Sequence, residues 1–188
     1  GWPYDTILAR LAADPAMAPG ALGQAIVEGY VGYYKRRFPK LAVTQSAIDL
    51  DRIEPLAAAV TNLAQALTDS LSDRAALGLL FGALRFAQSF TDRDYVDLTH
   101  FCRLLAQDDA GGTVGAAAQK VVDLLTGPDS PVIAEAHRGA EVANATGLSI
   151  YLPARVRSPL YNNLDFAQKH GWDDFLKAFV VQPPQGGS

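Results

Sequence analysis

The sequence predicts a helix-rich α/β fold, and three observations support this prediction. Thirty-one of the 188 residues are alanine, and alanine together with abundant leucine favours helix by intrinsic propensity. Apolar residues recur at helical spacing through most of the chain. By contrast, residues 41–48 and 146–152 carry no charge and read as strands. We therefore expect about seven to eight helices with a few strands between them.

The sequence pattern of the first part of the chain predicts two helices and a strand. The helices span about residues 6–13 and 19–36, and Asp14-Pro15 separates them, because a residue before proline is pushed out of the helical region. A basic cluster ends the second helix and complements the helix dipole, with a nucleic-acid contact as the alternative. The cluster is Lys35, Arg36 and Arg37. The strand follows over residues 41–48.

The middle of the chain predicts three helices. The first covers about residues 52–70. The second covers about residues 73–89 and is apolar almost all round, which is typical of a helix buried on most faces. Thr91 and Asp94 have the spacing of a capping box, so we expect the third helix over about residues 95–106.

For the rest of the chain, the sequence pattern predicts one more long helix, two extended segments and two short helices. These elements cover about residues 114–125, 132–137, 146–152, 164–169 and 172–179. The segment 182–188 is rich in proline and glycine and is expected to be a loose tail. The chain is therefore expected to form one domain over residues 1–181.

The predicted strands pose an architectural question. Two or three strands alone are marginally stable in water. The uncharged strand at 41–48 reads as a strand covered on both faces. We therefore expect sheet partners that this chain does not contain.

Composition excludes several classes of protein. Hydrophobic residues make up 49% of the chain and charged residues 19%, which excludes a disordered protein. The net charge is −4, so composition does not indicate a nucleic-acid binder. No apolar run reaches the ~18 to 20 residues of a membrane span. The chain opens on Gly1-Trp2-Pro3-Tyr4, without a start methionine or signal peptide, and so reads as a piece of a longer protein.

The sequence shows no recognisable nucleophile with a partnering base. Cys102 is the only thiol, which excludes an internal disulfide and a cysteine-based zinc site. It lies among apolar residues within a predicted helix, so we expect it to be buried and inert. His100, two residues earlier, falls on a different helix face, and an independent hydrolase built on Cys102 and His137 is the alternative. His170 is expected at a helix end, and Ser149 lacks the second glycine of a nucleophile elbow.

Paired carboxylates recur along the chain, and helix capping accounts for each pair. Three scattered histidines do not form a metal site. A calcium site is conceivable in two loops, but the spacing is not that of an EF-hand. We therefore expect no metal and no cofactor. The pairs are Asp49/Asp51, Asp92/Asp94, Asp108/Asp109 and Asp173/Asp174, the second and third being the calcium candidates.

A set of segments, in this order and spacing, resembles the C-terminal part of the clostripain family of cysteine peptidases. The resemblance extends from Gly1 to about Phe179, and its most specific segments are VTQSAIDL at 43–50 and GLSIYLP at 147–153. The other segments are GWPYDTIL at 1–8, residues 25–34, YVDLTHF at 95–101, Tyr161, LDFA at 164–167 and WDDFL at 172–176.

The resemblance implies the C-terminal part of a caspase-like α/β/α sandwich. Family members carry a catalytic histidine followed by glycine and a cysteine in an Asp-x-Cys segment, and both would precede Gly1. No histidine precedes Trp2 and no cysteine precedes Cys102, so the resemblance assigns no catalytic residue to this chain and predicts that it is inactive alone. Its implied partner is the upstream catalytic segment of the same protein, whose strands would share one sheet with residues 43–50 and 147–152.

The resemblance also implies a part in the substrate cleft. The loop after the nucleophile strand lines that cleft in the family, so Gly1, Trp2 and Tyr4 become the substrate-contact candidates, with Asp5 a weaker one. A tryptophan could stack on an arginine or lysine stem, in keeping with cleavage after Arg or Lys. The alternative is that Trp2 and Tyr4 only pack the first helix. Thr44 and Ser46 are expected near the sheet surface without an assigned role.

Two further expectations complete the sequence-based interpretation. The resemblance points to a bacterial protein that is secreted or extracytoplasmic and acts on peptide or protein substrates. A rival interpretation is a non-catalytic binding or assembly module whose apolar faces dock a partner subunit. Neither interpretation involves nucleic acid or a membrane.

Overall fold

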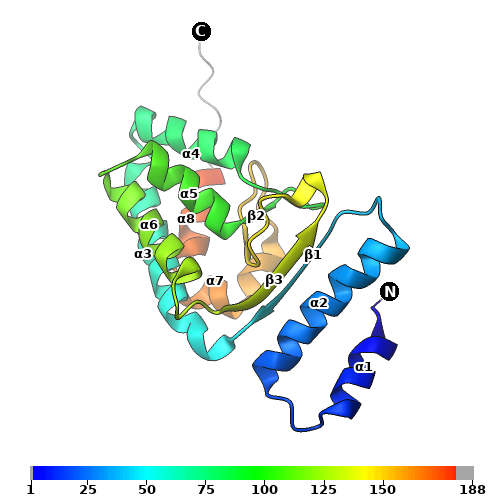
Figure 1. Ribbon diagram of the computed structural model, residues 1–188. Helices are drawn as coiled ribbons and strands as arrows, with labels where there is room; N and C mark the ends of the chain where they lie inside the picture. Colours follow the sequence, from blue (N-terminus) through cyan, green and yellow to red (C-terminus); the bar gives the residue numbers. More distant parts are fainter. Residues whose placement is uncertain (1, 181–188) are drawn as a thin grey trace.

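The computed structural model describes residues 2–180 and has the helix-rich α/β fold that the sequence predicts (Figure 1). Within this range it contains eight α-helices and four short strands. The predictions for Gly1 and for the tail at 182–188 lie outside the described residues. Among the helices of residues 2–180, none combines the length and hydrophobicity needed to cross a bilayer.

Two helices and a two-stranded ladder form the N-terminal side of the molecule. Helix α1 (Tyr4–Ala13) and helix α2 (Pro19–Arg37) lie close to their predicted positions. Strand β1 (Val43–Ile48) pairs antiparallel with β3 (Val132–Arg138). Helix α2 packs on this ladder, and a Cβ on its Gly23 would lie 3.0 Å from the Cβ of Ala47 in β1. Glycine thus permits the close approach of helix and strand.

A helical bundle forms the rest of the molecule and contains most of the core. Its members are α3 (Ile53–Ser70), α4 (Arg74–Phe86), α5 (Leu98–Asp108), α6 (Thr113–Thr126) and α8 (Trp172–Val180). The apolar stripe of α3 and the aromatic side of α8 meet in this core, where Leu63, Phe101 and Phe175 are fully buried. Three 3-10 turns connect elements: η1 (Leu50–Arg52), η2 (Ala140–Val142) and η3 (Pro159–Asn163).

The prediction that the helix at 73–89 is buried on most faces is wrong. Helix α4 buries only Leu80 and Ala83, while Phe86 is 68% exposed. The reason is its position at the edge of the bundle (Figure 1), where α5 is its main helical neighbour. The helix also ends at Phe86, because Ala87 adopts an extended conformation.

The helix predicted over 95–106 begins later than expected. Residues Tyr95–Asp97 form strand β2, which pairs antiparallel with β4 (Ser149–Tyr151). The cap is Asp97 rather than the predicted Thr91 and Asp94, and its carboxylate accepts the backbone N–H of His100 at 2.9 Å. The true N-cap therefore lies six residues after the predicted one, Thr91. Helix α7 (Asp165–Lys169) completes the fold.

The strands of the described residues form two separate ladders. Strand β1 pairs with β3, and β4 pairs with β2. That strands of an upstream segment join β1 and β4 in one sheet stays a prediction. The Ser46 hydroxyl of β1 donates to the carbonyl of Gly147, just before β4, at 2.6 Å. The Asp97 carboxylate accepts the Thr146 amide at 2.6 Å and so holds the chain leading into β4 beside β2.

Candidate functional site

The predicted substrate contacts Trp2 and Tyr4 lie in a connected group of aromatic rings on α1 and α2 and at their ends. The Trp2 ring centroid is 6.3 Å from that of Tyr4 and 5.4 Å from that of Tyr30. The rings continue along α2 to its C-terminal end. We call this group the aromatic surface: Trp2, Tyr4, Tyr30, Tyr33, Tyr34 and Phe38.

The aromatic surface is partly open to solvent, and its cations gather at one end. Trp2 and Phe38 are each 43% exposed, and Tyr4 is 63% exposed. Partial burial, then a hydrogen bond with Tyr34, raises the pKa of Tyr30, so the Tyr30 phenol is neutral at pH 7. The basic cluster occupies the last turn of α2, where the helix dipole favours it as predicted. Asp5 lies in the first turn of α1.

Cys102 cannot serve as a nucleophile in this conformation. Its side chain is 0% exposed within α5, and burial followed by the charge of Asp97 raises the pKa of its thiol far above neutrality. A thiolate is the reactive form of cysteine, so this group stays protonated and inaccessible. The prediction of a buried, inert cysteine is confirmed.

Each of the three histidine side chains lies close to a polar group. The Nδ1 of His100 accepts the backbone N–H of Gln88 at 2.9 Å, and burial is the main cause that lowers its pKa. His137, on β3, lies 2.8 Å from the Glu135 carboxylate through Nδ1 and belongs to a different element from Cys102. The two residues of the alternative hydrolase are therefore not brought together as a dyad. His170 Nδ1 lies 3.5 Å from the Thr61 hydroxyl.

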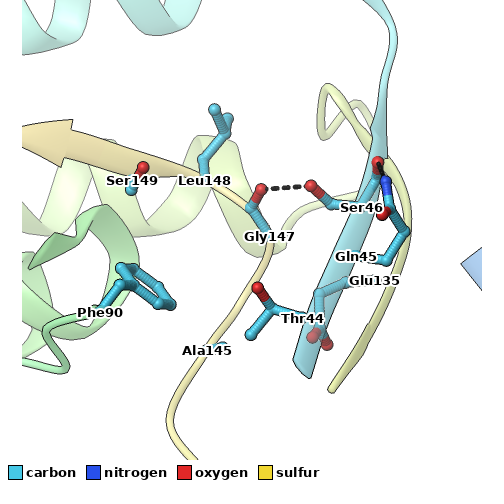
Figure 2. A pocket seen from close by; sticks show the side chains of 9 residues that line it. All are labelled: Thr44, Gln45, Ser46, Phe90, Glu135, Ala145, Gly147, Leu148 and Ser149. Atoms are coloured by element: carbon cyan, nitrogen blue, oxygen red, sulfur yellow. Dashed lines mark hydrogen bonds between the residues drawn. The ribbon is translucent and has the colours of Figure 1, made fainter. Parts of the chain in front are cut away.

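A polar cavity lies beside β1, and the sequence did not reveal it (Figure 2). Its volume is about 260 Å³. Thr44 and Ser46 line it from β1, as expected of residues near the sheet surface, and Glu135 lines it from β3 directly opposite Ser46. Phe90 and the segment around Gly147 close the other side.

Gly147 brings the segment after Thr146 close to the ladder. Its φ of +107° lies in the region that favours glycine, and a Cβ there would lie 2.9 Å from a methyl carbon of Val132. Gly147 was the sequence signal for this site. Its contact with Ser46 could not be predicted from sequence, because 101 residues separate the two positions. The cavity offers hydroxyls and one carboxylate, which suit hydrogen bonding to a polar group.

Asp97 anchors this wall of the cavity from within. It is 0% exposed and accepts the Thr146 amide at 2.6 Å and the Thr146 hydroxyl at 2.7 Å. Gln88 joins the same network, because its side chain donates to the Glu141 carbonyl and accepts the Asn144 amide. These bonds hold residues 141–146 against the start of α5. Asp97 and Gln88 were not identified from sequence.

The carboxylate pairs divide between capping and ion pairing. Asp49 and Asp92 accept backbone amides two residues ahead, and Asp109 accepts the amide of Gly115 at 2.7 Å. The capping prediction fails for Asp173, which is 5% exposed and pairs with Arg157 at 3.1 Å and Lys177 at 2.7 Å. Within residues 2–180, no group of three or more His, Cys, Asp or Glu could hold a metal ion.

Comparison with known proteins gives one match. Neither the curated proteins nor the solved structures include one that matches the chain. The family model described as the clostripain family matches residues 1–179, which is nearly the whole chain. The chain therefore belongs to the clostripain family of cysteine peptidases.

Proposed function

We propose that this chain is the C-terminal portion of a clostripain-like cysteine endopeptidase that cleaves after Arg or Lys. In this proposal an upstream segment of the same protein supplies the catalytic cysteine and histidine within a caspase-like sandwich. The chain described here supplies helical support, strands and part of the substrate cleft. The cysteine thiolate attacks the peptide carbonyl, and the histidine acts as acid and base.

The observation that carries the proposal is the burial of Cys102 in a chain of this family. A clostripain-family match covers residues 1–179, yet the single thiol of the chain is 0% exposed and its pKa is raised. A cysteine peptidase needs an accessible thiolate next to a base. The nucleophile is therefore assigned to a separate segment.

The substrate-contact role of Trp2 and Tyr4 is part of this proposal. Both rings are open to solvent, at 43% and 63%, so a substrate side chain can reach them. A tryptophan face can stack on an arginine guanidinium for about 0.5 to 2 kcal/mol. Gly1 is assigned to the same cleft by its position next to Trp2 in the sequence.

Reconstitution from two chains tests this function. The polypeptide encoded immediately upstream of Gly1 is expressed separately and mixed with this chain, and cleavage of fluorogenic peptides ending in Arg, Lys or Ala is measured. We expect Arg and Lys cleavage only in the mixture, and the same cleavage with Cys102→Ala. Activity of this chain alone that is lost in Cys102→Ala would refute the proposal.

The same experiment separates the rival function. A binding or assembly module would associate with the upstream chain without restoring cleavage of any of the three peptides. Association without cleavage would therefore favour the module over the peptidase.

A further inference from the structure

Helices α1 and α2 bury far less of themselves than the bundle helices do. No residue of α1 is buried, and Val27 is the only buried residue of α2. Helix α3 is about as long as α2 and buries eight residues. Leu8 of α1 is 59% exposed in addition to the rings of the aromatic surface. Apolar groups gathered in this way, rather than scattered singly, are typical of an interaction surface.

The charge around the aromatic surface differs from that of the whole chain. The complete sequence has 20 acidic and 16 basic residues, but residues 29–48 contain four basic residues and no acidic one. All four are exposed, at Lys35, Arg36, Arg37 and Lys40. An aromatic centre with a cationic end complements an apolar patch that is flanked by carboxylates.

The position of the aromatic surface leaves it accessible to a large partner. Helix α2 packs on the β1–β3 ladder, and α1 packs on α2. Figure 1 shows both helices on the side of this ladder away from α3–α6. The Trp2 ring, just before α1, lies 5.4 Å from the Tyr30 ring of α2. A segment joined to the N-terminal side of Gly1 would emerge next to Trp2. Such a segment could cover the surface without displacing the bundle.

We propose that the aromatic surface is the docking site for the upstream catalytic segment, through an apolar patch of that segment edged by carboxylates. This inference rests on the proposed function and adds the place and chemistry of the contact. Tryptophan, tyrosine and arginine are the residues that most often dominate binding energy at interfaces. The open ring of Phe38 forms the apolar centre, and Arg36 and Arg37 form the charged rim. Trp2 lies at the edge of the contact, where one side of its ring meets the docked segment and the other stays open to substrate.

Binding measurements on the two separate chains test the docking site. The upstream chain is immobilised, and association with this chain is followed by biolayer interferometry, with circular dichroism to establish that each variant is folded. We expect Trp2→Ala and Phe38→Ala each to weaken the dissociation constant by roughly 10- to 30-fold. The matched control is Phe86→Ala on α4, whose ring is 68% exposed outside the aromatic surface and whose loss should leave binding unchanged.

A charge reversal gives an independent test should an aromatic variant fail to fold. We expect Arg36→Glu combined with Arg37→Glu to slow association about tenfold at low salt, and less at high salt, because rim charges steer encounter. Wild-type affinity in the aromatic and charge variants, or no association of the wild-type chains, would overturn the docking site. Association that depends on the aromatic surface but gives no cleavage would refute the peptidase function and leave the docking site standing.

Discussion

Replacing Asp97 by alanine should be among the most destabilising single changes in the chain. The carboxylate is 0% exposed and accepts three hydrogen bonds, from the amide of His100 and from the amide and hydroxyl of Thr146. Hydrogen bonds to a charged group contribute about 1.5 to 3 kcal/mol each, and their losses are not additive. Removing them together and leaving the part-buried donors unpaired should cost about 3 to 5 kcal/mol.

A second capping aspartate provides the matched control. Asp73 caps α4 by accepting the amides of Ala75 and Ala76, at 2.8 and 3.4 Å, but these bonds are exposed. Water can replace its carboxylate, so Asp73→Ala should cost about 1 kcal/mol. Urea denaturation of both variants measures the difference, and hydrogen exchange of the Thr146 amide should accelerate only in Asp97→Ala. Equal costs for the two variants would refute the reasoning that burial gives Asp97 its importance.

Three further changes test other parts of the account. His100 must be neutral to accept the Gln88 amide, and its pKa is lowered from 6.5, so stability should fall as pH drops below about 6.5. Thermal melts should show less acid sensitivity in His100→Asn than in the wild type, and equal acid sensitivity would contradict this. Gly147→Ala should lower the free energy of unfolding by about 1 to 3 kcal/mol through backbone strain. Gly82→Ala in α4, where the space around the residue is open, should raise the free energy of unfolding by about 0.5 to 1 kcal/mol. Urea titrations that gave the two variants the same free energy of unfolding would contradict this. Asp173→Asn, in the buried pair with Arg157, should cost about 3 to 5 kcal/mol by calorimetry, against about 0.5 kcal/mol or less for Asp165→Asn in the exposed pair with Lys169.

Local sequence signals were enough for the helices and for β1. Alanine-rich stretches with apolar spacing predicted the long helices to within a few residues, and the uncharged run before Asp49 predicted β1. The same signals misplaced the start of α5, because Thr91 and Asp94 imitate a capping box while Asp97 makes the real cap. The candidate N-caps Thr91 and Asp97 lie six residues apart, and they cannot be ranked without the packing that buries Asp97.

The candidate sites depended on contacts that no local pattern records. The burial of Cys102 followed from its apolar neighbours and was predicted. The polar cavity was not, because it needs Ser46, Glu135 and Gly147 to meet across long sequence separations. The exposure of the aromatic surface was also hidden, since Tyr30 and Tyr34 show the same helical spacing whether their side of α2 is covered or open.

We propose that the nucleophile of this peptidase lies on the upstream segment, outside the chain described here. The most direct test treats the reconstituted two-chain mixture with an arginyl chloromethyl ketone and locates the modified cysteine by peptide mass spectrometry. The account predicts modification of a cysteine on the upstream chain and none at Cys102, which is buried in α5. Modification of Cys102 in the folded mixture, with parallel loss of cleavage, would contradict it.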